Sequence, residues 1–339
     1  MHMSDALLSV AVGGTMTAVS AGAIGYSVKK IKKIEIQDYK IPMMGVMGAF
    51  VFAAQMINFT IPATGSSGHI GGGILLAALL GPFPALITLA SVLLIQCLFF
   101  ADGGLLALGC NIFNMGVVSC LIAYPLLFKP ILKKGITPKR ITIASVLSVV
   151  VGLQAGAFSV VLETLASGIT KLPFHEFVLY MQPIHLAIGV AEGIVTAGVL
   201  CFVYGMRKEV IENALEGTSL ATVSVKKVLT CLVIATVFVG GILSLFASSY
   251  PDGLEWSIEG VTGTTELESN SEVHSAIEGV QEKTAFLPDY TFKEEAQADG
   301  TVGTSFSGIV GGAITFVIVA AAGIVILSFK RIKNSRASM

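Results

Sequence analysis

The chain has 339 residues, of which 54% are hydrophobic and only 13% charged, with a formal net charge of −1 at pH 7 and a mean hydropathy of +0.82. A soluble domain carries roughly a quarter charged residues, so a soluble globular protein is excluded, and the near-neutral charge gives no sign of a nucleic-acid partner. Many apolar runs approach the ~20 residues that a membrane-spanning helix needs. The composition therefore predicts an all-α polytopic membrane protein in the lipid bilayer.

The apolar runs predict nine spans in chain order. They cover residues 5–27, 42–60, 70–80, 84–100, 105–128, 141–167, 183–206, 227–248 and 306–329. The first run has no basic segment before it, which is unlike a secretory signal, so we expect a permanent first span with the N-terminus outside. With that orientation the inner segments hold 18 of the 21 lysines and arginines, as the positive-inside rule requires.

The spans divide the chain into three parts. Residues 1–206 form a block of seven spans, and residues 207–226 form a cytosolic connector. Residues 227–339 contain the last two spans and an acidic outer segment, 249–305. We expect the part from 264 to 285 to be solvated and partly disordered, because it is polar and acidic. His175 and His274, in predicted outer loops, are expected on the surface.

The first two residues, Met1 and His2, can chelate a metal ion. The terminal amine, the amide nitrogen of His2 and its imidazole close two fused rings around one ion, which suits nickel, copper or cobalt and leaves a fourth corner of the plane open. Met1 is expected to be retained, because removal of an initiator methionine generally needs a small second residue. The alternative is that His2 is an accident of a disordered terminus.

A glycine- and serine-rich loop from Pro62 to Gly73 lies on the same predicted side as Met1. Its glycines permit tight backbone paths, and the hydroxyls of Ser66 and Ser67 can support backbone groups near the membrane. His69 in this loop could fill the open corner of the chelate. The alternative is that His69 only stabilises the loop by hydrogen bonding.

Polar residues inside predicted spans form a supporting layer. Asn111 and Asn114 are one turn apart, and His185 and Glu192 are seven residues apart on one helix face. Ionisable residues inside a bilayer are functional candidates, so this face could relay protons or metal ions, or it could be a hydrogen-bonded pair that fixes helix register.

Two other functions remain possible for the same residues. Ser67 within Gly65 to Gly68, with His185 as partner, fits the short pattern of a rhomboid-like intramembrane serine protease, which leaves Met1 and His2 unexplained. Glu192 and His185 could also serve an ion-coupled secondary transporter. The chain has no phosphate-binding P-loop sequence, so any ATPase would be another chain.

Four stretches together resemble the CbiM/NikM family. They are Met1 to Leu7, Gly65 to His69, Asn111 to Gly116 and His185 to Gly193, and the similarity covers essentially residues 1–206. The string Pro-Asp-Gly-Leu-Glu at Pro251 to Glu255 is the hallmark of the small partner CbiN or NikN. The chain therefore resembles a fused protein of both parts.

The resemblance implies the substrate-binding membrane component of an energy-coupling factor (ECF) importer for nickel(II) or cobalt(II), not an enzyme. It implies metal ligands at Met1, His2 and His69, a coupling transmembrane protein and two ATPase subunits as partners, and the cell membrane of a prokaryote. No permanent cofactor is expected. Because a planar all-nitrogen site with a deprotonated amide suits nickel(II), we expect nickel slightly more than cobalt.

Overall fold

The computed structural model describes residues 1–33, 40–216, 225–267, 271–292 and 301–337, and most of them are helical. The longer helices are α1 (Val10–Lys33), α2 (Lys40–Gln55), α4 (Pro82–Phe100), η2 (Ile112–Phe128), α7 (Pro138–Ser167), α8 (Phe174–Met206), α10 (Lys226–Gly241) and α13 (Thr301–Ala337). The shorter ones are η1 (Asp5–Leu7), α3 (Gly73–Leu80), α5 (Leu108–Asn111), α6 (Lys129–Lys133), α9 (Lys208–Glu216), η3 (Leu243–Phe246), α11 (Gly253–Thr262), α12 (Glu272–Thr284) and η4 (Pro288–Tyr290). Two strands, β1 (Phe59–Ile61) and β2 (Ser66–Gly68), pair antiparallel.

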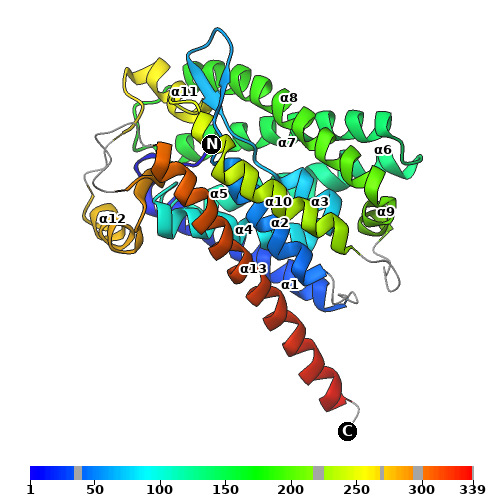
Figure 1. Ribbon diagram of the computed structural model, residues 1–339. Coiled ribbons are helices and arrows are strands. Elements are labelled where there is room, and N and C mark those ends of the chain that lie inside the picture. Colours follow the sequence, from blue (N-terminus) through cyan, green and yellow to red (C-terminus); the bar gives the residue numbers. More distant parts are fainter. Residues whose placement is uncertain (34–39, 217–224, 268–270, 293–300, 338–339) are drawn as a thin grey trace.

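Six helical stretches of the described chain are long and apolar enough to cross a membrane. They are Pro82–Phe100, Leu108–Lys133, Pro138–Ser167, Phe174–Met206, Lys226–Phe246 and Val302–Ile326. The expectation of an all-α polytopic membrane protein is confirmed. The hairpin, α11 and α12 lie at the same end of the bundle as the N-terminus, while α6 and α9 lie at the opposite end (Figure 1).

The last two long helices pack on the first part of the chain, not beside it as a separate bundle. Both α10 and α13 pack against α2 and against each other, whereas α7 packs mainly against α8. The crossing of α10 and α13 depends on glycine, because a Cβ atom on Gly308 would collide with the backbone of Gly240. Small residues at such crossings allow close helix approach in lipid.

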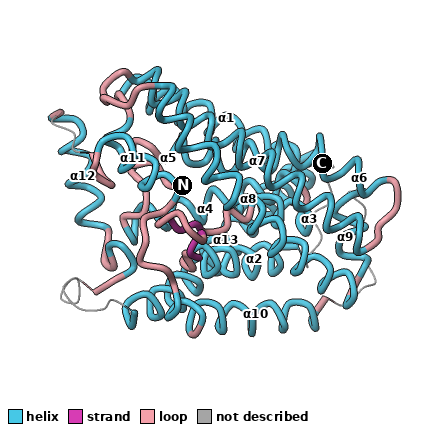
Figure 2. Tube along the Cα trace, turned by 90° about the horizontal axis from the view of Figure 1, so that it is seen from above, coloured by secondary structure: helices cyan, strands magenta, loops and turns pink. Residues whose placement is uncertain are grey.

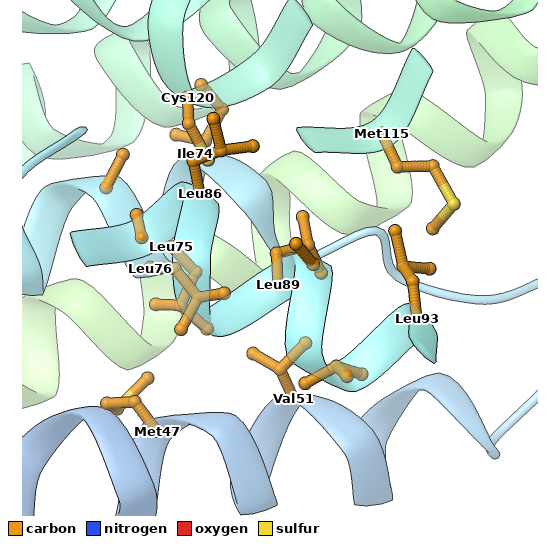
Figure 3. Packing of buried hydrophobic residues seen from close by; sticks show 14 of the residues in the cluster. Met47, Val51, Ile74, Leu75, Leu76, Leu86, Leu89, Leu93, Met115 and Cys120 are labelled. Carbon is orange, nitrogen blue, oxygen red and sulfur yellow. The ribbon is translucent and has the colours of Figure 1, made fainter. Parts of the chain in front are cut away.

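The short helix α3 is buried on all sides at the centre of the bundle. Its residues Ile74, Leu75 and Leu76 pack among α2, α4 and η2 (Figure 3). Eight residues span only about 12 Å, much less than the ~30 Å of a bilayer core. The end of α3 is fixed near α9, because Gly81 lies near Ala214. The short helix must therefore begin well inside the bundle, and the loop before it must reach that depth.

The N-terminal segment differs from its prediction. The first span was expected from residue 5, but α1 begins at Val10, and residues 1–8 run through the bundle with only the short η1 turn. Met3, Leu7 and Leu8 are fully buried. Backbone groups of this segment are paired with other elements instead of with a helix of their own, which apolar periodicity cannot predict.

The expected disorder between 264 and 285 is wrong for α12. One face of this helix binds backbone carbonyl groups of the bundle: His274 donates to Leu8 (2.9 Å), and Gln281 donates to Gly103 (2.7 Å) and Cys97 (2.9 Å). His274 is therefore buried, not on the surface as predicted, whereas His175 is exposed at the start of α8. Parts of the predicted connector and acidic segment, residues 217–224, 268–270 and 293–300, lie outside the described residues.

Candidate metal site

The N-terminal segment is held in the bundle by backbone pairing. Asn111 accepts from the amide nitrogen of Met3 (2.8 Å) and donates to its carbonyl oxygen (3.2 Å). Gly104 donates to that carbonyl as well (2.9 Å), and Asp5 accepts from the amide of Ala107 (2.9 Å). These contacts fix the backbone two residues after the terminal amine, so the position of the amine is determined by the fold.

Met1, His2 and His69 meet inside this end of the bundle. The amine nitrogen of Met1 lies 2.9 Å from Nε2 of His69. The rings of His2 and His69 are stacked, with centroids 5.0 Å apart and planes inclined by 16°. Met1 is 6% exposed and His69 is 8% exposed. The strands that carry the His69 loop lie beside the N-terminus in both views (Figures 1 and 2).

Both imidazoles are neutral at physiological pH. Burial, together with the positive charge of the amine, lowers the pKa of His2 and of His69 to about 3. Nδ1 of His69 lies 3.1 Å from the carbonyl oxygen of Ile70, to which it donates, so Nε2 carries the lone pair that faces the amine. A neutral imidazole oriented by a backbone carbonyl is the usual form of a histidine metal ligand.

Two carboxylates flank these nitrogen donors. Oδ2 of Asp252 accepts from the Met1 amine (2.5 Å), and Oδ1 of Asp102 lies 3.1 Å from Nδ1 of His2. Tyr290 donates its hydroxyl to Asp102 (2.5 Å). Burial raises the pKa of Asp102, while the Tyr290 hydrogen bond lowers it. The C-terminal part of the chain therefore contacts both Met1 and, through Asp102, His2.

Helix α11 aims Asp252 at the amine. Oδ1 of Asp252 accepts from the amides of Leu254 and Glu255, and Glu255 accepts from the amide of Asp252, which completes a capping box. The other carboxylate oxygen, Oδ2, is left for Met1. Next to it, Pro251 accepts from the amide of Ser67 (2.8 Å). The segment before α11 thus lies along strand β2.

The other predicted residues have separate roles. Ser67 donates its hydroxyl to the carbonyl oxygen of Tyr250 (2.7 Å), and Ser66 donates to that of Pro251 (3.4 Å), so both serve the contact between the loop and the C-terminal part. Asn114 donates to Glu163 (2.8 Å). Glu192 accepts from the amide of Gly72 (2.9 Å) and so ties the His69 loop to α8.

His185 and Glu192 share a helix face but are not paired with each other. Nδ1 of His185 donates to the carbonyl of Met181 (2.8 Å). His185 instead lines a small cavity together with Met1 and His69. The structure thus brings His185 to the same cavity as two of the predicted ligands.

Sequence reasoning missed Asp102, Asp252 and Tyr290 as parts of this site. Asp252 belongs to the acidic outer segment and to the string that carries the family resemblance, and an Asp three residues before a Glu also indicates a capping box. Asp102 follows a predicted span on the same outer side as His2, which could have indicated it. No sequence pattern indicates that Tyr290 reaches Asp102.

The arrangement is suited to a planar nitrogen site. Two nitrogen ligands at adjacent corners of a square plane, each about 2 Å from the ion, lie about 2.8 Å apart, close to the observed distance between the Met1 amine and Nε2 of His69. In the chelate, Nδ1 of His2 is the ring atom that closes the six-membered ring. Because that atom faces Asp102 here, metal binding by His2 would require its ring to turn about the Cβ–Cγ bond.

Side chains alone do not make this site. No group of three or more His, Cys, Asp or Glu side chains within the described residues is placed to hold a metal ion. A site that uses a terminal amine and a backbone amide would not need such a group, since half of its donors are main-chain nitrogens.

Comparison with known proteins matches both parts of the chain. The family described as CbiM, cobalt uptake substrate-specific transmembrane region, matches residues 2–210, and the PDGLE domain matches residues 226–328. A protein of Archaeoglobus fulgidus named as a fused nickel transport protein, NikMN, is 30% identical over 98% of this chain and 99% of its own length. The fused nickel transport protein NikMN of Rhodobacter capsulatus is 31% identical over 62% of this chain and 64% of its own length.

A solved structure agrees with these sequence relatives. The crystal structure of a truncated transition metal transporter is 28% identical, covers 61% of this chain and 99% of its own, and superposes with a TM-score of 0.54. Nothing among these similarities favours the serine protease or the secondary transporter considered from the sequence. The chain belongs to the CbiM family of transition-metal transport proteins and carries a C-terminal PDGLE domain.

Proposed function

We propose that this protein captures nickel(II) or cobalt(II) outside the cell membrane and carries it inward as the substrate-binding component of an ATP-driven ECF importer. The observation that supports it best is the meeting of three nitrogen donors: the amine of Met1 lies 2.9 Å from Nε2 of His69, with the ring of His2 stacked on that of His69. The deprotonated amide of His2 would be the fourth donor. An all-nitrogen plane of this kind favours nickel slightly over cobalt.

The proposed division of labour follows the two matched families. The seven spans of residues 1–206 would bind the ion. Residues 207–226 would connect this part to residues 227–339, which would supply the acidic outer segment that closes over the N-terminus. ATP hydrolysis would come from two ATPase subunits acting through a coupling transmembrane protein. The N-terminus would lie outside, as the placement of α9 and the basic segment of α6 at the opposite end of the bundle supports (Figure 1).

The function is tested by nickel uptake in cells that contain the complete importer. His2→Ala and His69→Ala should each abolish high-affinity uptake, whereas His175→Ala, an exposed histidine on α8, should not. Extension of the chain by one residue before Met1 should be nearly as harmful, because it removes the amine from its corner. Normal uptake by the extended chain, at normal protein levels, would rule out the terminal chelate.

A further inference from the structure

One nitrogen atom beside the proposed chelate has no assigned role. His185 is 1% exposed, and Nδ1 donates to the carbonyl of Met181 at 2.8 Å. The proton on Nδ1 leaves Nε2 with a free lone pair, and Nε2 has no hydrogen-bond partner in the described part of the chain. A buried acceptor without a partner is costly, so a group at this position calls for a ligand or a water molecule.

The free nitrogen lines the cavity that the proposed ligands line. Met1, His69, Asp252 and His185 border a space of about 10 Å³, close to the smallest volume that holds one water molecule. A Cβ atom on Gly253 would lie 3.3 Å from Nε2 of His185. The absence of a side chain at this residue of the PDGLE string therefore keeps the approach to that nitrogen open.

His185 has the same arrangement as the proposed ligand His69. In both residues Nδ1 is directed at a backbone carbonyl, of Met181 or of Ile70, and Nε2 is left with its lone pair. This is how metal-binding histidines are commonly oriented. His274, in contrast, directs Nε2 at the carbonyl of Leu8.

A second cavity continues from the first into the bundle. Gly71, Met115 and Leu153 border both, and the second is also lined by Asn114 and Glu192. Glu192 follows His185 by seven residues on α8, about 10 Å along the helix axis, in the direction of α9. One face of α8 thus presents the imidazole nitrogen of His185 to the first cavity and the carboxylate of Glu192 to the second.

We propose that Nε2 of His185 is a further ligand for the transported ion, a relay position that holds a divalent first-row metal beside the Met1–His2–His69 chelate. The proposal rests on the proposed function and adds a residue that the chelate does not need. Imidazole nitrogen binds nickel, cobalt and copper, and Asp252 borders the same cavity with a negative charge. The relay offers one imidazole nitrogen, so it is a weaker site than the four-nitrogen chelate beside it.

The relay is tested with cobalt(II) as the probe, because its visible absorption reports the number and type of its ligands. The full chain with a native N-terminus is placed in lipid nanodiscs, and the His2→Ala variant is used to remove the chelate. We expect weak residual cobalt binding in His2→Ala, and at least tenfold weaker binding when His185→Gln is added. His175→Gln in the same background is the matched control and should leave residual binding unchanged.

The outcomes separate the relay from the chelate. The fold of His185→Gln is verified separately, by a thermal unfolding temperature of the metal-free protein close to that of the wild type. Two results would overturn the relay. Either His2→Ala binds no cobalt(II), or its cobalt(II) affinity is the same with and without His185→Gln. In both cases Nε2 of His185 only accepts a hydrogen bond from water. If His2→Ala binds the first equivalent as wild type does, the chelate itself fails.

Discussion

The amine of Met1 and the carboxylate of Asp252 are ion-paired at 2.5 Å, although they are 251 positions apart in the chain. Burial alone would raise the pKa of Asp252, but the adjacent amine outweighs it and holds this pKa well below the usual range. The PDGLE domain therefore places a negatively charged carboxylate beside the amine nitrogen that the chelate would use.

This pairing matters because the charge beside Asp252 stays constant when the ion binds. The metal-free site carries one positive charge, on the protonated amine. A nickel(II) chelate with a neutral amine and one deprotonated amide also carries one positive charge. Asp252 can therefore balance both states, so it supports the site without favouring release or retention of the ion.

Proton release measures this exchange directly. Because the pKa values of His2 and His69 are lowered to about 3, neither imidazole has a proton to lose at pH 7. We expect about two protons to leave per nickel(II) bound, one from the amine and one from the amide of His2. Calorimetry in buffers of different ionisation enthalpy gives this number, and a release near zero would contradict the proposed ligand set.

Asp252→Asn should destabilise the protein much more than it weakens nickel binding. The substitution keeps a side chain that caps α11 but leaves the buried amine without its partner, at a cost of about 3 kcal/mol. We expect a lower unfolding temperature of the metal-free protein and a change in nickel affinity of less than tenfold. Glu259→Gln, an exposed residue of the same helix, is the control.

A loss of nickel affinity in Asp252→Asn as large as that in His69→Ala would show that Asp252 is itself a ligand. Thermal unfolding in detergent and equilibrium titration distinguish the two results, since the first reports the ion pair and the second the metal site.

Tyr290→Phe tests the chain of contacts from η4 to His2. The variant removes one hydroxyl that donates to Asp102, so the carboxylate beside His2 is held less firmly. Loss of such a supporting contact typically weakens metal binding about 10- to 100-fold. Nickel titration of the full chain measures the change, with Tyr250→Phe, an exposed tyrosine, as control. Tighter binding in Tyr290→Phe would mean that Asp102 only holds the metal-free ring.

Two glycines of the C-terminal part should respond oppositely to alanine. A Cβ atom on Gly253 would lie 2.7 Å from Cδ1 of Ile188, whereas Gly279 has open space. Gly253→Ala should destabilise the protein by about 1–3 kcal/mol through overpacking, and Gly279→Ala, within α12, should be neutral or stabilise it by up to about 1 kcal/mol. Thermal unfolding of both variants checks the pair, and equal stability would contradict the close contact between α11 and α8.

The sequence predicts the parts of this molecule that depend on local composition. Hydropathy finds the long helices because a bilayer requires apolar runs of fixed length, and Met1 with His2 indicates a chelate because the two residues are adjacent. Hydropathy misplaces the start of the first helix, since Leu7 and Leu8 continue its apolar run. The backbone of the preceding segment instead pairs with Asn111 and Gly104.

Long-range contacts account for the rest. Neither the burial of His274 against Leu8 nor the pairing of Tyr290 with Asp102 leaves a local pattern, because each joins residues far apart in the chain. α12 is polar overall, and its few buried residues bind backbone carbonyls instead of apolar side chains, so composition alone suggested disorder.

The depth of Met1 also sets an order of events during synthesis. In a cell that starts its proteins with formylmethionine, the formyl group must be removed before the amine can meet Asp252, and a blocked end would leave Oδ2 of that carboxylate without its cationic partner. Asp252 follows Met1 by 251 positions, and their translation takes roughly 10–50 seconds. The enzyme that removes the formyl group thus has that interval to act, since Asp252 is synthesised long after Met1 has left the ribosome.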